Sequence, residues 1–167
     1  MTAFERLAGW IDRLNDTIGR AVAWLALPVI ACLFLQIPLR EVVHNYYLQV
    51  NDTGQTFHAT LFMIATAYAM RWDQHVRVDV FHRWMSPRAR AVVELVGTVL
   101  FLWPWLVMFG WYSWPVVIES WSELEAYPDT WTPGYFLLQT NLVVFDALVG
   151  LQSIAIVIRA VSALRRR

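Results

Sequence analysis

The chain has 167 residues, of which 58% are hydrophobic and only 16% are charged. Because a soluble domain carries about 25% charged residues, this composition favours a membrane protein. The formal net charge is zero, which argues against nucleic acid as a partner. The single cysteine, Cys32, excludes an internal disulfide and a CxxC redox or zinc module.

The first 19 residues predict an amphipathic helix. The apolar side chains, spaced by three and four, are Phe4, Leu7, Ile11, Leu14 and Ile18. A helix with one apolar face, placed directly before a long apolar run, is typical of a segment that lies in the plane of a membrane interface. We therefore expect residues 1–19 to lie along the cytoplasmic surface.

Four long apolar segments follow, over about residues 21–42, 54–72, 88–118 and 133–160. The first holds 19 consecutive uncharged residues, enough helix to cross a hydrocarbon core of roughly 30 Å. The second is the least apolar. A soluble all-α core would need more polar surface than remains to cover four such segments. Residues 1–167 are therefore predicted to form a single all-α membrane domain with four transmembrane helices.

The arginines predict the orientation. Twelve of the 13 basic residues, all arginines, flank the apolar segments on one side, and only Arg40 lies on the other. The loop between the third and fourth segments carries acidic residues and no basic residue. Because cytoplasmic loops are rich in arginine, we expect both termini and the 71–90 connection in the cytoplasm.

The 71–90 connection contains the sequence HVRVDVFHRW. Its alternating valines suggest a strand, but a lone strand would leave its backbone hydrogen bonds unpaired. His75, Asp79 and His82 could be counted as metal ligands, but their spacing is not a recognised ligand motif and nearby arginines would repel a cation, so we expect no metal. We expect Arg77 and Asp79 to form ion pairs at the headgroup level, with each other or with a neighbour.

The sequence MSPRAR that follows predicts the start of a helix. Ser86 is a preferred N-cap residue, and Pro87 suits the first helical position. Glu94 then falls near the positive end of the helix dipole, where Arg90 can pair with it.

Polar residues inside the apolar segments are expected to join helices. Asp146 lies near the middle of the fourth segment, where a charged side chain costs roughly 2.5–3.5 kcal/mol and should face protein. We expect it to be neutral or to form a buried hydrogen bond between helices or subunits, with Thr66, Tyr68 or Gln36 as candidate partners; a proton or ion site is the alternative. Interhelical hydrogen bonds are also expected from the amides of Gln36, Gln139, Asn141 and Gln152.

The stretch AMRWDQHVRVDVFHRWMSPRARAVVELVGTVLFLWPWLVMF closely resembles the small membrane subunit (DctQ-like) of tripartite ATP-independent periplasmic, or TRAP, transporters. In that family an H-V-R-V-D segment after the second span is followed by an S-P-R-x-R-A helix start. Further matches are Trp114-Pro115 and Leu151-Gln152. The resemblance covers nearly the whole chain and implies a multi-pass protein of the bacterial inner membrane.

The resemblance implies a scaffold rather than an enzyme. The family's small subunit packs beside a large permease subunit, which is driven by a sodium gradient. A periplasmic binding protein delivers the solute, often a carboxylate. No cofactor is expected. The residues expected to serve the subunit interface or the fold are Arg77, Asp79, Ser86, Pro87, Arg88, Glu94, Trp114, Pro115, Asp146 and Gln152.

The acidic loop between the third and fourth segments has two interpretations. It could steer and dock the periplasmic binding protein, or it could be a solvated loop that obeys the charge rule. The residues concerned are Glu119, Trp121, Glu123, Glu125 and Asp129.

A membrane anchor of a respiratory enzyme is the alternative function. Such anchors hold b-type haem between two histidines on facing helices. His44 and His58 lie near the outer ends of the first two segments. His44 lies beyond the apolar run, which favours the transporter subunit.

Overall fold

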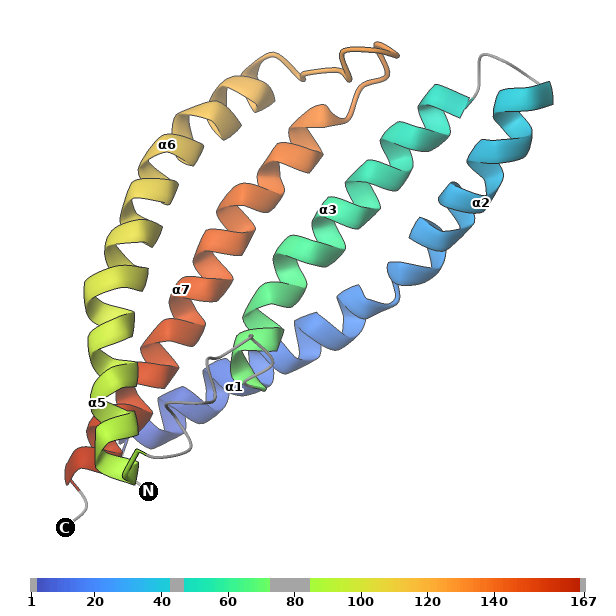
Figure 1. Ribbon diagram of the computed structural model, residues 1–167. Coiled ribbons are helices and arrows are strands. Elements are labelled where there is room, and N and C mark those ends of the chain that lie inside the picture. The colour runs from blue at the N-terminus through green and yellow to red at the C-terminus, as the bar shows by residue number, and fades with distance from the viewer. Residues whose placement is uncertain (1–2, 43–46, 73–84, 166–167) are drawn as a thin grey trace.

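A computed structural model describes residues 3–42, 47–72 and 85–165 (Figure 1). These residues are mostly helical, and no strand occurs among them beyond an isolated bridge between Ala126 and Pro133. The all-α prediction is confirmed. The helices are α1 (Ala3–Ala23), α2 (Ala26–Val42), α3 (Tyr47–Arg71), α5 (Pro87–Gly97), the π-helix η1 (Thr98–Leu102), α6 (Trp103–Ser122) and α7 (Tyr135–Arg165).

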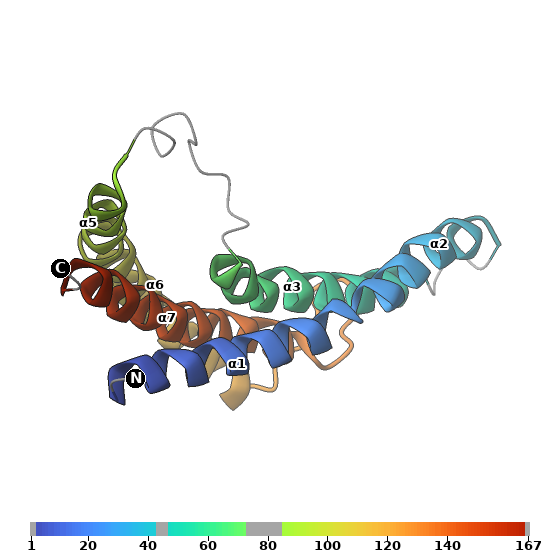
Figure 2. The same cartoon turned by 90° about the horizontal axis from the view of Figure 1, so that it is seen from below.

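Four long helices lie side by side in one curved layer, in the order α2, α3, α7 and α6 (Figure 1). α3 packs against α2 and α7, and α7 packs against α3 and α6, so α2 and α6 form the two edges. α1 crosses α3 and α7 on one face of the layer (Figure 2). We call the end of the layer near Ala3 and Arg165 the termini end, and the opposite end, with residues 123–134, the loop end.

Among the described residues, three helical segments are long and apolar enough to cross a membrane. They are Ala3–Val42, Pro87–Ser122 and Tyr135–Arg165. α3 has 25 residues, which is also a sufficient length, but its polar side chains keep its hydropathy lower. It corresponds to the segment that the sequence marks as the least apolar of the four.

α1 is amphipathic, and its buried face is small and partly polar. Ala8, Ile11, Asn15 and Gly19 are buried on this face, which packs against α3 and α7. Gly19 is required by the close approach of α3, because a Cβ atom there would lie 2.5 Å from the Tyr68 side chain.

The predicted apolar stripe of α1 is divided in the structure. Ile11 is buried, and Ile18 packs against the main core cluster, whereas Phe4 and Leu7 are exposed. The helix continues to Ala23 before a turn at residues 24–25, since residues 20–23 include neither proline nor glycine.

The helix that begins at Pro87 runs to Ser122 with one irregular turn. Ser86 Oγ accepts a hydrogen bond from the backbone N–H of Ala89 at 3.2 Å, and Pro87 stands at the start of the helix. The predicted helix start is thus confirmed. Near the middle, η1 has the wider i→i+5 bonding of a π-helix, and the N–H of Trp103 donates to the carbonyl of Thr98.

The hydrophobic core is thin. Most large apolar side chains of α2 and α6 are exposed, because a layer one helix thick buries little on either face. Both faces therefore need lipid or protein to cover them. The main buried cluster consists of Ala67, Leu106, Leu148 and Val149.

Candidate functional site

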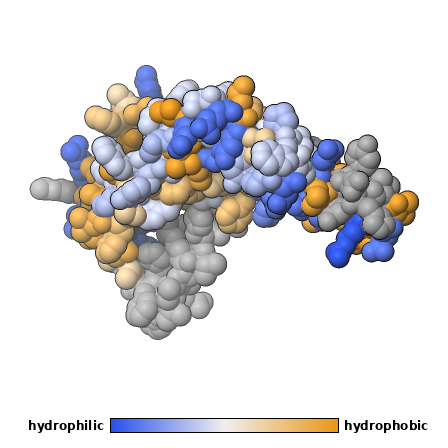
Figure 3. Space-filling model, turned by 90° about the horizontal axis from the view of Figure 1, so that it is seen from above, coloured by the Kyte–Doolittle hydropathy of each residue, from blue (hydrophilic) through white to orange (hydrophobic). Residues whose placement is uncertain are grey.

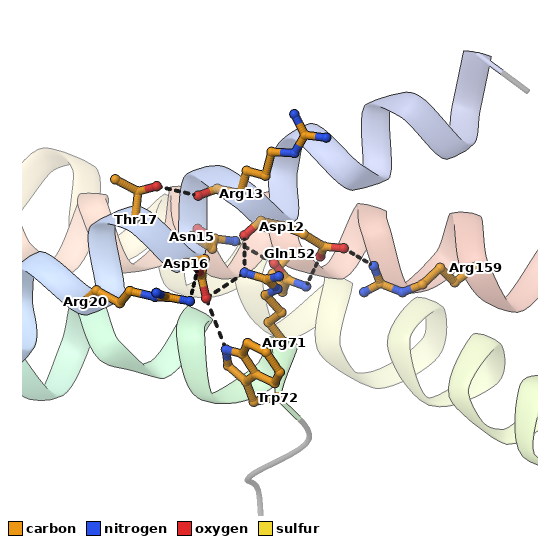
Figure 4. Close-up of polar contacts among 10 residues, drawn as sticks. All are labelled: Asp12, Arg13, Asn15, Asp16, Thr17, Arg20, Arg71, Trp72, Gln152 and Arg159. Atoms are coloured by element: carbon orange, nitrogen blue, oxygen red, sulfur yellow. Dashed lines mark hydrogen bonds and ion pairs between the residues drawn. The ribbon is translucent and has the colours of Figure 1, made fainter. Parts of the chain in front are cut away.

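Acidic side chains of α1 point toward α3 and α7 near the termini end (Figure 4). Asp16 Oδ1 lies 2.7 Å from Arg71 Nη1 of α3, and Asp16 Oδ2 lies 2.8 Å from Arg20 Nη2, one turn along α1. The indole N–H of Trp72 donates to Asp16 Oδ1 at 3.3 Å. The Arg71 side chain is 23% exposed and that of Arg20 is 69% exposed, so only the pair with Arg71 is largely removed from water.

Asp12 joins α1 to α7 and α3. Its Oδ2 accepts a hydrogen bond from Arg159 Nη1 at 2.6 Å, and its Oδ1 accepts one from Gln152 Nε2 at 3.0 Å. Its carbonyl oxygen accepts from Arg71 Nη1 at 2.9 Å. Gln152 is fully buried and accepts a hydrogen bond from Asn15 Nδ2 at 2.7 Å. We call these residues the α1 cluster: Asp12, Asn15, Asp16, Arg71, Gln152 and Arg159.

The α1 cluster holds three helices together. Each carboxylate is compensated by an arginine of another helix, and the interhelical bond predicted for Gln152 is confirmed. From the sequence, the acids of α1 were assigned no role. One signal could have identified them: Asp12, Asn15, Asp16 and Gly19 follow spacings of three and four, so they share one side of the helix.

The other interhelical amide bonds run along the layer. Gln36 Nε2 of α2 donates to Asn51 Oδ1 of α3 at 2.9 Å. Asn141 Nδ2 of α7 donates to Thr60 Oγ1 of α3, also at 2.9 Å. The predictions for these two amides are confirmed. Gln139 of α7 bonds instead to the loop that follows α6.

Asp146 faces α6 rather than α2 or α3. A Cβ atom at Gly110 would lie 2.7 Å from Asp146 Oδ2, so the absence of a side chain there makes room for the carboxyl group. Asp146 Oδ1 is buried without a hydrogen-bond partner among the described residues. The predicted partners are engaged elsewhere: Thr66 bonds within its own helix, Gln36 bonds to α3, and Tyr68 packs against α1. The expectation that one of these three residues is its partner is therefore wrong.

The loop of residues 123–134 is hydrogen-bonded to α3. Thr130 Oγ1 donates a hydrogen bond to the buried Asp52, and the hydroxyls of Tyr127 and Thr56 are hydrogen-bonded to each other. Tyr127 also packs edge-to-face on Tyr135 at the start of α7, with ring centroids 5.4 Å apart. The loop is thus part of the folded structure.

Glu125 is bonded inward. Its carboxylate accepts hydrogen bonds from Ser120 Oγ at 2.6 Å and from Gln139 Nε2 at 2.9 Å. The expected surface of four acids is reduced by this bonding to three exposed ones. We call these the outer acids: Glu119, Glu123 and Asp129.

Aromatic and apolar side chains stand beside the outer acids. The indole N–H of Trp121 donates to Thr140 Oγ1 at 2.8 Å. Trp131 is 82% exposed at a φ of 55°, and Leu124 is exposed at a φ of 48°. A positive φ is uncommon outside glycine and marks local strain. Seen from above the loop end, hydrophilic residues occupy much of the surface and hydrophobic ones gather along its sides (Figure 3).

The remaining predicted site residues are scattered. Arg88 and Glu94 lie on α5, and Trp114 and Pro115 lie within α6 with exposed side chains. His58 lines a groove between α2 and α3. The residues that lie outside the described part of the chain are His44, His75, Arg77, Asp79 and His82.

A family model described as tripartite ATP-independent periplasmic transporters, DctQ component, matches residues 29–167. The chain belongs to the DctQ family. No curated protein and no solved structure matches it. The DctQ component belongs to a transporter and is not an enzyme, which decides against the respiratory anchor. The match begins inside α2, so the α1 cluster joins a helix outside the matched region to residues within it.

Proposed function

We propose that this DctQ chain is the scaffold subunit of a three-component secondary transporter. It packs beside a large permease subunit, which carries an organic solute across the bacterial inner membrane on an ion gradient. A periplasmic binding protein delivers the solute. The match to the DctQ component over residues 29–167 is the observation that carries this proposal.

The proposed topology has four crossings, with both termini in the cytoplasm. The crossings are α2, α3, α7 and the continuous helix from α5 to α6. The positions of the arginines support this topology, because cytoplasmic segments are rich in arginine. The arginines of α1, α5, α7 and the end of α3 lie near the termini end, whereas Arg40 lies near the loop end. α3 can cross despite its lower hydropathy because Asp52, Thr56 and Thr60 are bonded to the loop or to α7.

The polar contacts support a scaffold rather than a solute pathway. A pathway needs polar groups that face a shared passage. In the described part of the chain, several polar groups instead bond in pairs between neighbouring helices, as Gln36 does with Asn51 and Asn141 does with Thr60. The ion pairs gather at the termini end. Such bonds fix helices relative to one another and leave the solute to the large subunit.

We propose an organic carboxylate as the solute and sodium as the coupling ion, as the family resemblance implies. The test is uptake into proteoliposomes that contain the large permease subunit of the same system, with its binding protein outside. A panel of radiolabelled carboxylates and an inward sodium gradient should give uptake only when this chain is present. Equal uptake without the chain would contradict the scaffold role, and uptake that needs no sodium gradient would contradict the coupling ion.

A further inference from the structure

A groove of about 290 Å³ lies between α2 and α3, in the half of the layer toward the loop end. Cys32 and Gln36 of α2 and Gly54, Gln55 and His58 of α3 line it. Gly54 lets the two helices approach, since a Cβ atom there would lie 3.1 Å from Cβ of Cys32. α2 is an edge of the layer and packs mainly on α3 (Figure 1).

The groove lies within the thickness of the proposed membrane domain. Its α2 residues extend from Val29 to Gln36, and the uncharged run of α2 ends at Leu39. At 1.5 Å per residue, the groove therefore lies roughly 5–15 Å inside the end of that run. This is the outer half of a hydrocarbon core about 30 Å thick.

The groove contains polar groups that are not bonded within the described chain. Gln55 and His58 are exposed, and neither side chain hydrogen-bonds another described residue; His58 only stacks on Phe62. Hydrocarbon offers no hydrogen-bond partner, so amide and imidazole groups at this depth normally face protein. The opposite face of α3 follows this rule, because its polar groups bond to α7 and the loop.

The other edge of the layer has a different surface. A groove along α6 is lined almost entirely by apolar and aromatic side chains, among them Val99, Val107, Met108 and Trp111. Trp103 also lines this groove, and its indole N–H donates to Ser153 Oγ of α7 at 2.9 Å. This surface matches lipid tails, which form no hydrogen bonds. The two edges therefore differ in what can cover them.

We propose that the groove between α2 and α3 receives a transmembrane helix of the large permease subunit, with Gln55 and His58 bonded to its hydroxyl, amide or carbonyl groups. The proposal rests on the proposed function and adds to it the edge of the layer that carries the contact. Interhelical hydrogen bonds of this kind join helices in membranes. The α6 edge then faces lipid.

Photo-crosslinking tests which edge meets the large subunit. Benzoylphenylalanine is placed at Leu33, a groove residue that is 60% exposed, and in a matched variant at Val107 on α6, which is 72% exposed. Each variant is expressed with the tagged large subunit and illuminated in membranes. We expect a cross-linked product with the large subunit from Leu33 and little or none from Val107. A Leu33 variant that no longer co-purifies, while the Val107 variant does, also supports the proposal, since the bulky group then blocks docking.

Two results would overturn the groove proposal and leave the scaffold function intact. In the first, both variants co-purify with the large subunit, and the cross-linked product from Val107 is as abundant as that from Leu33. The other is labelling of phospholipid alone from Leu33. If the unsubstituted chain does not co-purify with the large subunit, the proposed function itself fails, and the groove proposal fails with it.

A second experiment tests the polar groups themselves. The double variant Gln55→Leu with His58→Leu should lower the yield of co-purified complex about tenfold, through the loss of two interhelical hydrogen bonds. Thr53→Val is the control, because the Thr53 hydroxyl donates to the carbonyl of Gln49 in its own helix. An unchanged or higher yield for the double variant would show that lipid covers the groove and would overturn the proposal.

Discussion

Removing Asp16 is expected to destabilise the membrane domain, whereas removing Arg20 is not. Asp16 pairs with Arg71 and with Arg20 at nearly equal distances, 2.7 Å and 2.8 Å. The two pairs differ in the exposure of the arginine and in whether the arginine belongs to another helix. Arg20 is mostly exposed and lies on the same helix as Asp16, whereas Arg71 is mostly buried and belongs to α3. Only the second pair holds two helices together.

The expected magnitudes follow from this difference. Removing one partner of a buried ion pair costs about 3–5 kcal/mol, and an exposed pair contributes about 0–1 kcal/mol. Arg71 is partly exposed and keeps the carbonyl of Asp12 as an acceptor. We therefore expect Asp16→Ala to cost about 2 kcal/mol, an intermediate value. For a domain of this size that lowers the Tm by about 4–8 °C, and Arg20→Ala should lower it by less than about 4 °C.

Thermal unfolding in mild detergent, followed by tryptophan fluorescence, measures these shifts. A double-mutant cycle with Asp16→Ala and Arg71→Ala should give a coupling energy of about 1–2 kcal/mol. The reasoning is refuted if Arg20→Ala lowers the Tm as much as Asp16→Ala does. A coupling below about 0.5 kcal/mol would refute it as well, because contacting residues normally couple by more than that.

The remaining predictions concern the two ends and the middle of the layer. Replacing the three outer acids by their amides should slow uptake more at low salt than at high salt, because salt screens electrostatic steering of the binding protein; uptake equal to that of the unsubstituted chain at every ionic strength leaves only a solvated loop. Arg77→Ala and Asp79→Ala should each lower the yield of complex with the large subunit, and exchanging the two residues should restore part of it if they pair with each other; normal yields in both alanine variants would contradict this. Gly110→Ala should destabilise the chain by about 1–2 kcal/mol in thermal unfolding, because overpacking outweighs the gain in helix propensity. Gly110→Ala should be neutral or stabilising when Asp146→Ala is also present. A loss of stability from Gly110→Ala both with and without Asp146→Ala would exclude Asp146 as the cause.

Local patterns in the sequence were sufficient for the helices and for several of their contacts. The N-cap at Ser86 depends on two adjacent residues, so it was readable from MSPRAR. The bonds of Gln36, Asn141 and Gln152 were predictable because an amide that is buried or partly buried in a membrane helix requires a partner, whichever residue supplies it.

Contacts between distant helices were not readable in the same way. Asp12 bonds to Gln152 and Arg159, which are 140 and 147 residues away, and periodicity identifies a face but not what lies against it. Asp146 was assigned to the wrong neighbour for this reason. Its place depends on the missing side chain of Gly110, which has no signature of its own in the sequence. The order of helices in the open layer is likewise a property of the packed structure.

The π-helical turn of η1 has a consequence for how changes in chain length act on this protein. Along the helix from α5 to α6, buried positions occur at Ala91, Thr98, Leu106 and Ser113. The step is seven residues on either side of the turn and eight across it, so the wider turn accommodates one extra residue while both halves stay in phase with α7. Deleting one residue within the turn would restore a regular α-helix with a seven-residue step throughout, which leaves the buried positions on one face. Deleting one residue elsewhere in this helix would rotate one half by about 100° relative to the other, so the turn is the place where the helix tolerates a change in length.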